Sequence, residues 1–274
     1  MAVEVKFWGV RGSIACASAN HVVYGGNTSC IELTLGDATL VLDAGTGIRM
    51  LGKEVLRRQT RSGVLLLTHT HWDHVNGFPF FAPIYVPGWQ FRVLAGHLFD
   101  KGGIKNALAS QMTTPMFPVP LQALRADMHY QDFKAGDTLT DLLPGVTART
   151  APLNHPNGAT GYRIEFGGRS VAYITDTEHV PGKPDQNVLG LIAGADLAIY
   201  DSTYTDDEFP NRIGWGHSTW QEAIRLGQEA GVKRLAIFHH DPDHTDDMME
   251  VIEDQARRAW DRALVARDGM VISL

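Results

Sequence analysis

The chain has 274 residues, of which 44% are hydrophobic and 20% charged, a globular composition that excludes a mainly disordered protein. Its net charge of −7 argues against a general polyanion binder. No apolar run approaches the roughly 18 residues that a membrane span needs, and the start, MAVEVKFWGV, has no signal-peptide pattern, so no membrane partner is expected. The two cysteines, Cys16 and Cys30, are too few for a disulfide scaffold, which predicts a reducing, cytoplasmic setting.

Short apolar strands alternate with helices along the chain, which predicts a single α/β domain over residues 1–274. A helix is expected at 46–58, another from the capping box that begins at Ser218, and a last one after residue 245. The stretch 97–131 departs from this rhythm, since it contains the segment MTTPMFPVP; it is either a lid or insertion over a cleft, or a surface connector. Strands are predicted at 3–8, 30–35, 39–42, 64–68, 146–150, 162–166, 170–175, 196–200 and 234–238.

Five of the predicted strands run directly, or within a few residues, into a side chain that can bind a metal ion or move a proton. These side chains are His69, His155, Asp176, Asp201 and His239. In open α/β sheets, ligand sites lie beyond the strand ends, where the loops converge. Five endings of one kind therefore predict that these groups meet in space.

The strongest local signal is the run HTHWDH, which follows the strand at 64–68. Residues two apart on an extended segment point the same way, so His69 and His71 can bind one cation together. Asp73 and His74 follow as the chain turns, and they can reach a second cation nearby. The motif contains imidazole and carboxylate ligands but no thiolate, which is more typical of a catalytic metal site than of a structural zinc site.

Three residues downstream complete the candidate metal site. His155 follows a predicted strand and would supply a third nitrogen, although a histidine alone is more often packed or solvated. The Asp176 carboxylate can bridge two cations that keep it ionised; the alternative is a helix cap. His239 and His240 compete, because neighbours on a strand face opposite ways, and His239 is preferred because it comes first after the apolar run.

The HTHWDH run, with its downstream partners, resembles the metallo-β-lactamase superfamily, and in particular the phosphodiesterase branch that includes ribonuclease Z. The resemblance implies an α/β fold, an αβ/βα sandwich of two mixed β-sheets flanked by helices, with a binuclear metal site at one edge. Zinc is the expected metal, and manganese or iron suits the same ligands. By the family pattern one ion would be held by His69, His71 and His155, the other by Asp73, His74 and His239, with Asp176 between them.

The element Gly216-His217-Ser218-Thr219 resembles one in ribonuclease Z and its phosphodiesterase relatives. The resemblance implies that His217, backed by Asp201, donates a proton to the leaving group, while Asp73 orients a hydroxide that bridges the metal ions. Relatives often have glutamate where this chain has Asp201, so the contact between Asp201 and His217 stays open. The alternative is that His217 only neighbours a helix cap.

A binuclear metal-dependent phosphodiesterase acting on a small substrate, such as a cyclic nucleotide, is the preferred function. The alternatives are an RNA or DNA end-processing nuclease, a carboxylic ester or lactone hydrolase on the same metal pair, and a non-catalytic domain that keeps its metals for stability. Structured RNA is less expected, because the short stretch between Asp176 and Asp201 has no long basic arm. By analogy alone, a homodimer is expected. Arg11, in a glycine-rich loop, either steadies a phosphate or belongs to a tight turn.

Overall fold

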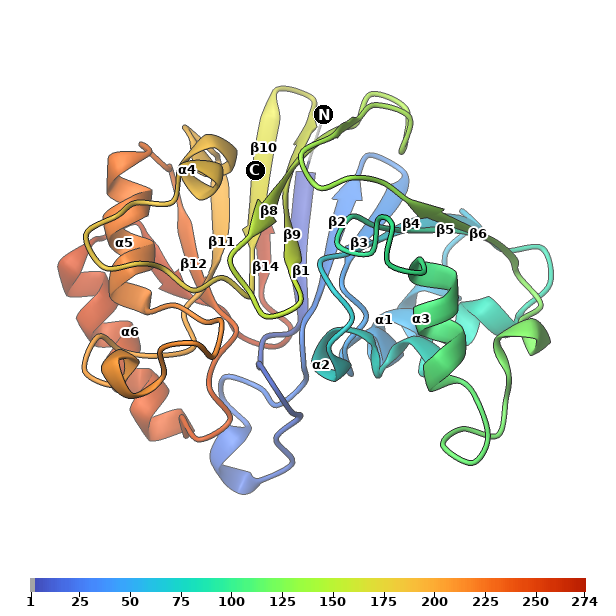
Figure 1. Ribbon diagram of the computed structural model, residues 1–274, viewed down its shortest axis with the longest axis horizontal. Coiled ribbons are helices and arrows are strands. Elements are labelled where there is room, and N and C mark those ends of the chain that lie inside the picture. The colour runs from blue at the N-terminus through green and yellow to red at the C-terminus, as the bar shows by residue number, and fades with distance from the viewer. Residues whose placement is uncertain (1–2) are drawn as a thin grey trace.

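Two mixed seven-stranded sheets pack face to face, with helices on both outer faces (Figure 1). The computed structural model describes residues 3–274. In the first sheet the order is β14-β1-β2-β3-β4-β5-β6, and β3 to β6 run parallel to one another. Its strands are β1 (Val3–Gly9), β2 (Cys30–Leu35), β3 (Ala38–Leu42), β4 (Ser62–Leu67), β5 (Gln90–Ala95), β6 (Asp127–Asp132) and β14 (Val271–Ser273).

The second sheet repeats this plan with the order β13-β12-β11-β10-β9-β8-β7. Its strands β10 to β13 are parallel, whereas β7 to β10 are joined by antiparallel pairings. Parallel neighbours end at the same edge of a sheet, so the loops after these strands converge. The strands are β7 (Thr138–Leu139), β8 (Thr147–Leu153), β9 (Ala159–Phe166), β10 (Arg169–Ile174), β11 (Leu197–Asp201), β12 (Leu235–Phe238) and β13 (Ala263–Val265).

Three apolar layers hold the sandwich together. The central layer joins the inner faces of the two sheets and includes Phe7, Tyr173 and Phe238. The outer layers pack the helices onto the sheets, as helix-covered sheet faces require. The helices are α1 (Ile48–Val55), α2 (Trp72–Val75) and α3 (Ile104–Gln111) on the first sheet, and α4 (Gln186–Ile192), α5 (Trp220–Glu229) and α6 (Asp246–Ala259) on the second (Figure 1). Short 3₁₀ turns lie at Ala19–His21, Phe78–Phe80, Ala82–Tyr85, Leu121–Ala123 and Phe209–Asn211.

The predicted αβ/βα sandwich is confirmed, and all nine predicted strands are present, within a few residues of the expected bounds. Strand β6 was not predicted, because an edge strand reading DMHYQD has no apolar run. The stretch 97–131 therefore contributes helix α3 and the edge strand β6. Between them, residues 112–120 form no helix or strand, as the prolines predicted.

The start of α5 differs from expectation. The cap of α5 is Thr219, whose hydroxyl accepts a hydrogen bond from the Glu222 amide, so the capping box begins one residue after Ser218. The Ser218 hydroxyl instead contacts His179 Nδ1, 2.8 Å away.

Among residues 3–274, none of the helices has the length and apolar composition that spanning a membrane requires.

Candidate active site

The five strand ends named from the sequence meet at one edge of the sandwich, below the two sheets in Figure 1. His69 follows β4, His155 follows β8, Asp176 follows β10, Asp201 ends β11 and His239 follows β12. All five are largely buried. The parallel strands supply this convergence, because their loops leave the two sheets at the same edge.

Three histidines form the first group of candidate ligands. His69, His71 and His155 each offer a ring nitrogen, and the three atoms lie within 4.8 Å of one another. His155 Nε2 is 3.0 Å from His71 Nδ1. His69 Nε2 is buried and has no hydrogen-bond partner in residues 3–274.

The second group lies directly beside the first. Asp73, His74, Asp176 and His239 also offer ligand atoms within 4.8 Å of one another. The Nε2 atoms of His74 and His239 are 3.3 Å apart, and each is 3.2–3.3 Å from Asp73 Oδ2. The second group therefore brings four ligand atoms close enough together to hold one cation.

Asp176 lies between the two groups, with one oxygen toward each. Its Oδ1 is 3.7 Å from His69 Nε2 and 3.6 Å from His155 Nε2. Its Oδ2 is 3.1 Å from His74 Nε2 and 3.3 Å from His239 Nε2. A carboxylate in this position can link two cations.

Hydrogen bonds outside the cluster fix the ring orientations of these histidines. Thr68 Oγ1 donates its one hydrogen to Asp43, so it accepts from His69 Nδ1, 3.1 Å away. Thr203 Oγ1 likewise donates to Asp201 at 2.7 Å and accepts from His239 Nδ1 at 3.0 Å. In both histidines the proton is on Nδ1, which leaves the lone pair of Nε2 directed into the cluster, as metal-binding histidines require.

The sequence reasoning missed Asp43, although this residue directly follows the apolar strand β3. Its Oδ2 is 2.8 Å from His74 Nδ1 and accepts the Tyr173 hydroxyl at 2.9 Å. The strand-end pattern that identified five other residues would have identified this one. Thr68 and Thr203 carried no signal, because an isolated threonine is common at any strand end.

The backbone of the site is strained and closely packed. Asp43, Asp176 and His239 have φ values of 61°, 58° and 63°, the left-handed region that side chains other than glycine rarely adopt and that clusters at functional sites. Gly12 brings the amino-terminal loop against His239, and a Cβ at Gly12 would lie 2.3 Å from His239 Cε1. A Cβ at Gly216, which has φ +87°, would lie 2.3 Å from His155 Nδ1.

Burial and charge act in opposite directions on the histidines. Burial lowers the pKa of His69 well below its ordinary value, so this imidazole is neutral and can bind a metal. Burial also acts to lower the pKa of His74, but the carboxylates of Asp176, Asp73 and Asp43 outweigh it and raise that pKa. The site thus gathers an excess of buried negative charge around imidazole nitrogens.

These residues fit a pair of divalent metal ions. The Nε2 atom of His69 is buried without a hydrogen-bond partner in residues 3–274, which is unfavourable unless a cation or a proton lies beside it. The Nε2 atoms of His74 and His239 face each other at 3.3 Å, which is unfavourable for two acceptors unless a cation or a proton lies between them. Imidazole nitrogens and carboxylate oxygens without thiolate are the donor set of zinc, manganese and iron in catalytic sites.

His217 and Asp201 form a pair beside the metal-ligand cluster. His217 Nδ1 is 3.0 Å from Asp201 Oδ2 and 3.8 Å from Asp176 Oδ1, so the aspartate is long enough to reach the histidine. Thr177 N and Thr203 Oγ1 donate to Asp201 and hold it in place. Burial acts to lower the pKa of His217, but Asp201 outweighs it and raises that pKa to about 9. Asp201 thus favours the protonated form of this imidazole, which is the form that a general acid needs.

Two other residues considered from the sequence lie outside the cluster. His240 Nε2 donates to Ala266 O at 2.8 Å, away from the ligands. Arg11 is fully buried, and its guanidinium donates to the carbonyls of Gly25 and His244 at 2.8 and 2.7 Å. Backbone carbonyls occupy the Nε and Nη1 donors of Arg11, whereas its Nη2 is buried without a hydrogen-bond partner in residues 3–274. A role for Arg11 in steadying a phosphate therefore stays a prediction.

Comparison with known proteins agrees with this architecture. Residues 38–240 match the family described as beta-lactamase superfamily domain. The chain is 26% identical to a ribonuclease Z of Haloarcula marismortui, over 98% of this chain and 96% of that one. It is 30% identical to a ribonuclease Z of Lactiplantibacillus plantarum, over 85% and 87% of the two chains. Among solved structures, the metallo-beta-lactamase fold protein YhfI of Bacillus subtilis has a TM-score of 0.74 at 20% identity, covering 100% of both chains.

The chain therefore belongs to the beta-lactamase superfamily. Its fold and its cluster of histidines and aspartates define it as a metal-dependent hydrolase.

Proposed function

We propose that this protein is a binuclear metal-dependent phosphodiesterase that hydrolyses small or single-stranded nucleotide substrates. His69, His71 and His155 would hold one ion, Asp73, His74 and His239 would hold the other, and Asp176 would be shared between them. Zinc is the expected metal. Such a pair of ions would supply a nucleophile at neutral pH and offset the negative charge of a phosphodiester.

The pairing of His217 with Asp201 carries the proposal. Hydrolysis of an alkyl phosphodiester expels a strongly basic alkoxide, which needs a proton as it leaves. His217 lies beside Asp176, and Asp201, 3.0 Å from its Nδ1, holds the ring and favours its protonated form. Its Nε2–H is therefore free to donate to the leaving oxygen, a function that hydrolysis of an activated ester does not require.

Asp73 has a second part in this mechanism. Its Oδ2 accepts the Ser13 amide at 2.7 Å while it faces His74 and His239. The hydrogen bond from the rigid loop fixes the direction of the carboxylate, so that Asp73 can orient the attacking water. Asp73 thus acts both as a ligand and as an orienting group.

The size of the substrate follows from the loop between β10 and β11. Residues 177–196 contain the seven-residue helix α4 and no long basic arm, which favours small or single-stranded phosphodiesters over structured RNA. The two relatives named ribonuclease Z favour a nuclease that trims RNA ends, which remains the second candidate. A steep salt dependence and competition by RNA would distinguish it.

The test compares leaving groups in metal-reconstituted protein. His217→Ala should slow hydrolysis of a dinucleotide, whose leaving group is an alkoxide, by about 10²–10⁴-fold. The same variant should slow bis(p-nitrophenyl) phosphate far less, because p-nitrophenolate leaves without a proton. Equal losses on both substrates, or full activity of the variant on the dinucleotide, would refute the role of His217 as the proton donor.

A further inference from the structure

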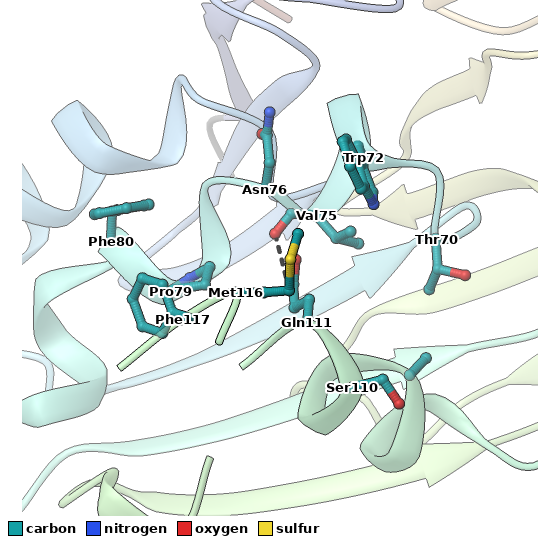
Figure 2. A pocket seen from close by; sticks show the side chains of 11 residues that line it. Thr70, Trp72, Val75, Asn76, Pro79, Phe80, Ser110, Gln111, Met116 and Phe117 are labelled. Carbon is teal, nitrogen blue, oxygen red and sulfur yellow. Dashed lines mark hydrogen bonds between the residues drawn. The ribbon is translucent and has the colours of Figure 1, made fainter. Parts of the chain in front are cut away.

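A cavity of about 430 Å³ lies between α2 and α3, beside the HTHWDH motif (Figure 2). Trp72 and Phe80 lie on either side of it in Figure 2, with Met116 and Phe117 of the proline-rich segment also lining it. Trp72, Phe80 and Met116 are 73%, 54% and 71% exposed. Large apolar side chains that line an open cavity next to an active site are typical of a ligand pocket.

The cavity is connected to the metal-ligand cluster through the chain itself. Trp72 lies between His71 and Asp73 in the sequence, so a short backbone segment separates the indole from two candidate ligands. The motif alternates its side chains: His71 faces the metal ligands, while Trp72 lines the cavity. The Gln111 amide donates to Val75 O at 3.1 Å (Figure 2), which fastens α3 to α2.

The chemistry of the lining indicates what the cavity accepts. None of its lining side chains is charged, so a phosphate or an ammonium group would lose hydration without compensation. A flat, uncharged aromatic group would stack on the exposed indole of Trp72 and cover the apolar lining.

We propose that this cavity binds a nucleobase of the substrate, stacked on Trp72. The proposal rests on the proposed phosphodiesterase function and adds a base-binding pocket to it. Every nucleobase has a π-face, so stacking on an aromatic side chain tolerates any base. The proline-rich segment, for which a lid over a cleft and a surface connector were the two expectations, then forms one wall of this pocket.

The position of the pocket also assigns which part of the substrate it holds. The leaving alcohol must lie at the proton donor His217, whose ring centroid is 5.3 Å from that of His155. Trp72 directly follows His71 in the sequence, and the proposal places the base in its pocket on the nucleoside that stays on the phosphate.

The test compares two p-nitrophenyl esters that share a leaving group. One is the p-nitrophenyl ester of thymidine 5′-monophosphate, and the other is methyl p-nitrophenyl phosphate, which lacks a base. The measured quantity is the ratio of their kcat/KM values. The metal-reconstituted wild type should prefer the nucleoside ester, and Trp72→Ala should reduce this ratio on the order of tenfold. Trp72→Phe, which retains a ring, should restore most of it.

The matched control is Met50→Ala, which removes an exposed apolar side chain from α1 outside the pocket and should leave the ratio unchanged. A ratio that is the same in Trp72→Ala as in the wild type, or no preference in the wild type, would overturn the pocket. If the wild type hydrolyses neither ester, the phosphodiesterase function fails, and calorimetry with thymidine 5′-monophosphate then decides on the pocket. A Kd about tenfold weaker in Trp72→Ala supports the pocket, and equal Kd values overturn it.

Discussion

Replacing Gly12 by alanine should disable the metal centre without unfolding the protein. The added Cβ would lie 2.3 Å from His239 Cε1 and 2.4 Å from its Nδ1, whereas carbon atoms pack at about 3.5 Å. The imidazole must therefore move by about 1 Å, since Gly12 N is held by His240 O at 3.0 Å. A displacement of this size at a reacting centre costs about 10²-fold in rate.

The assay has three measurements: hydrolysis of bis(p-nitrophenyl) phosphate, bound metal by mass spectrometry, and the melting temperature. We expect Gly12→Ala to lose about 10²-fold in kcat/KM and to bind one of its metal ions more weakly. Gly190→Ala is the matched control, because a Cβ there meets nothing within 4 Å, and α4 tolerates alanine. Wild-type rate and full metal content in Gly12→Ala would refute the assignment of His239 as a ligand.

Asp43→Ala should weaken metal binding 10- to 100-fold in a chelator competition, because His74 loses the acceptor that orients it; unchanged affinity would contradict this. Burial raises the pKa of the Asp268 carboxyl to about 6. The protonated carboxyl therefore stabilises the folded protein fully below the pKa of the unfolded chain, near 3.8, and this stabilisation is lost as the pH rises through 6. Between pH 4 and 6, denaturant titrations should therefore show the free energy of unfolding of Asp268→Asn rising by up to about 3 kcal/mol relative to that of the wild type. Parallel curves of this free energy against pH for the two proteins would contradict the prediction. Arg11→Met should lower the free energy of unfolding by about 3 kcal/mol, because buried carbonyls lose their donor. The variant should leave KM unchanged, and a raised KM would instead indicate that Arg11 binds the phosphate of the substrate.

Most of the candidate site could be predicted because metal chemistry restricts residue types. The spacing in HTHWDH, and single residues such as His155 and His239 after apolar strands, identified candidate ligands that the fold brings together. Asp43 was within reach of the same reasoning and was overlooked. Arg11 was ambiguous, because a sequence does not say whether a guanidinium faces a ligand or backbone carbonyls.

The positions of the central strands along the chain were determined locally, since runs such as Val64–Leu67 and Leu235–Phe238 are apolar whatever they contact. Three features were decided only by tertiary packing. The polar strand β6 forms because β5 offers it an unpaired edge. The choice of His239 over His240 depends on a left-handed backbone at His239 that brings its ring against Gly12. The cavity beside Trp72 exists because Gln111 ties α3 to α2. Each depends on contacts between residues distant in the sequence, which local propensity does not encode.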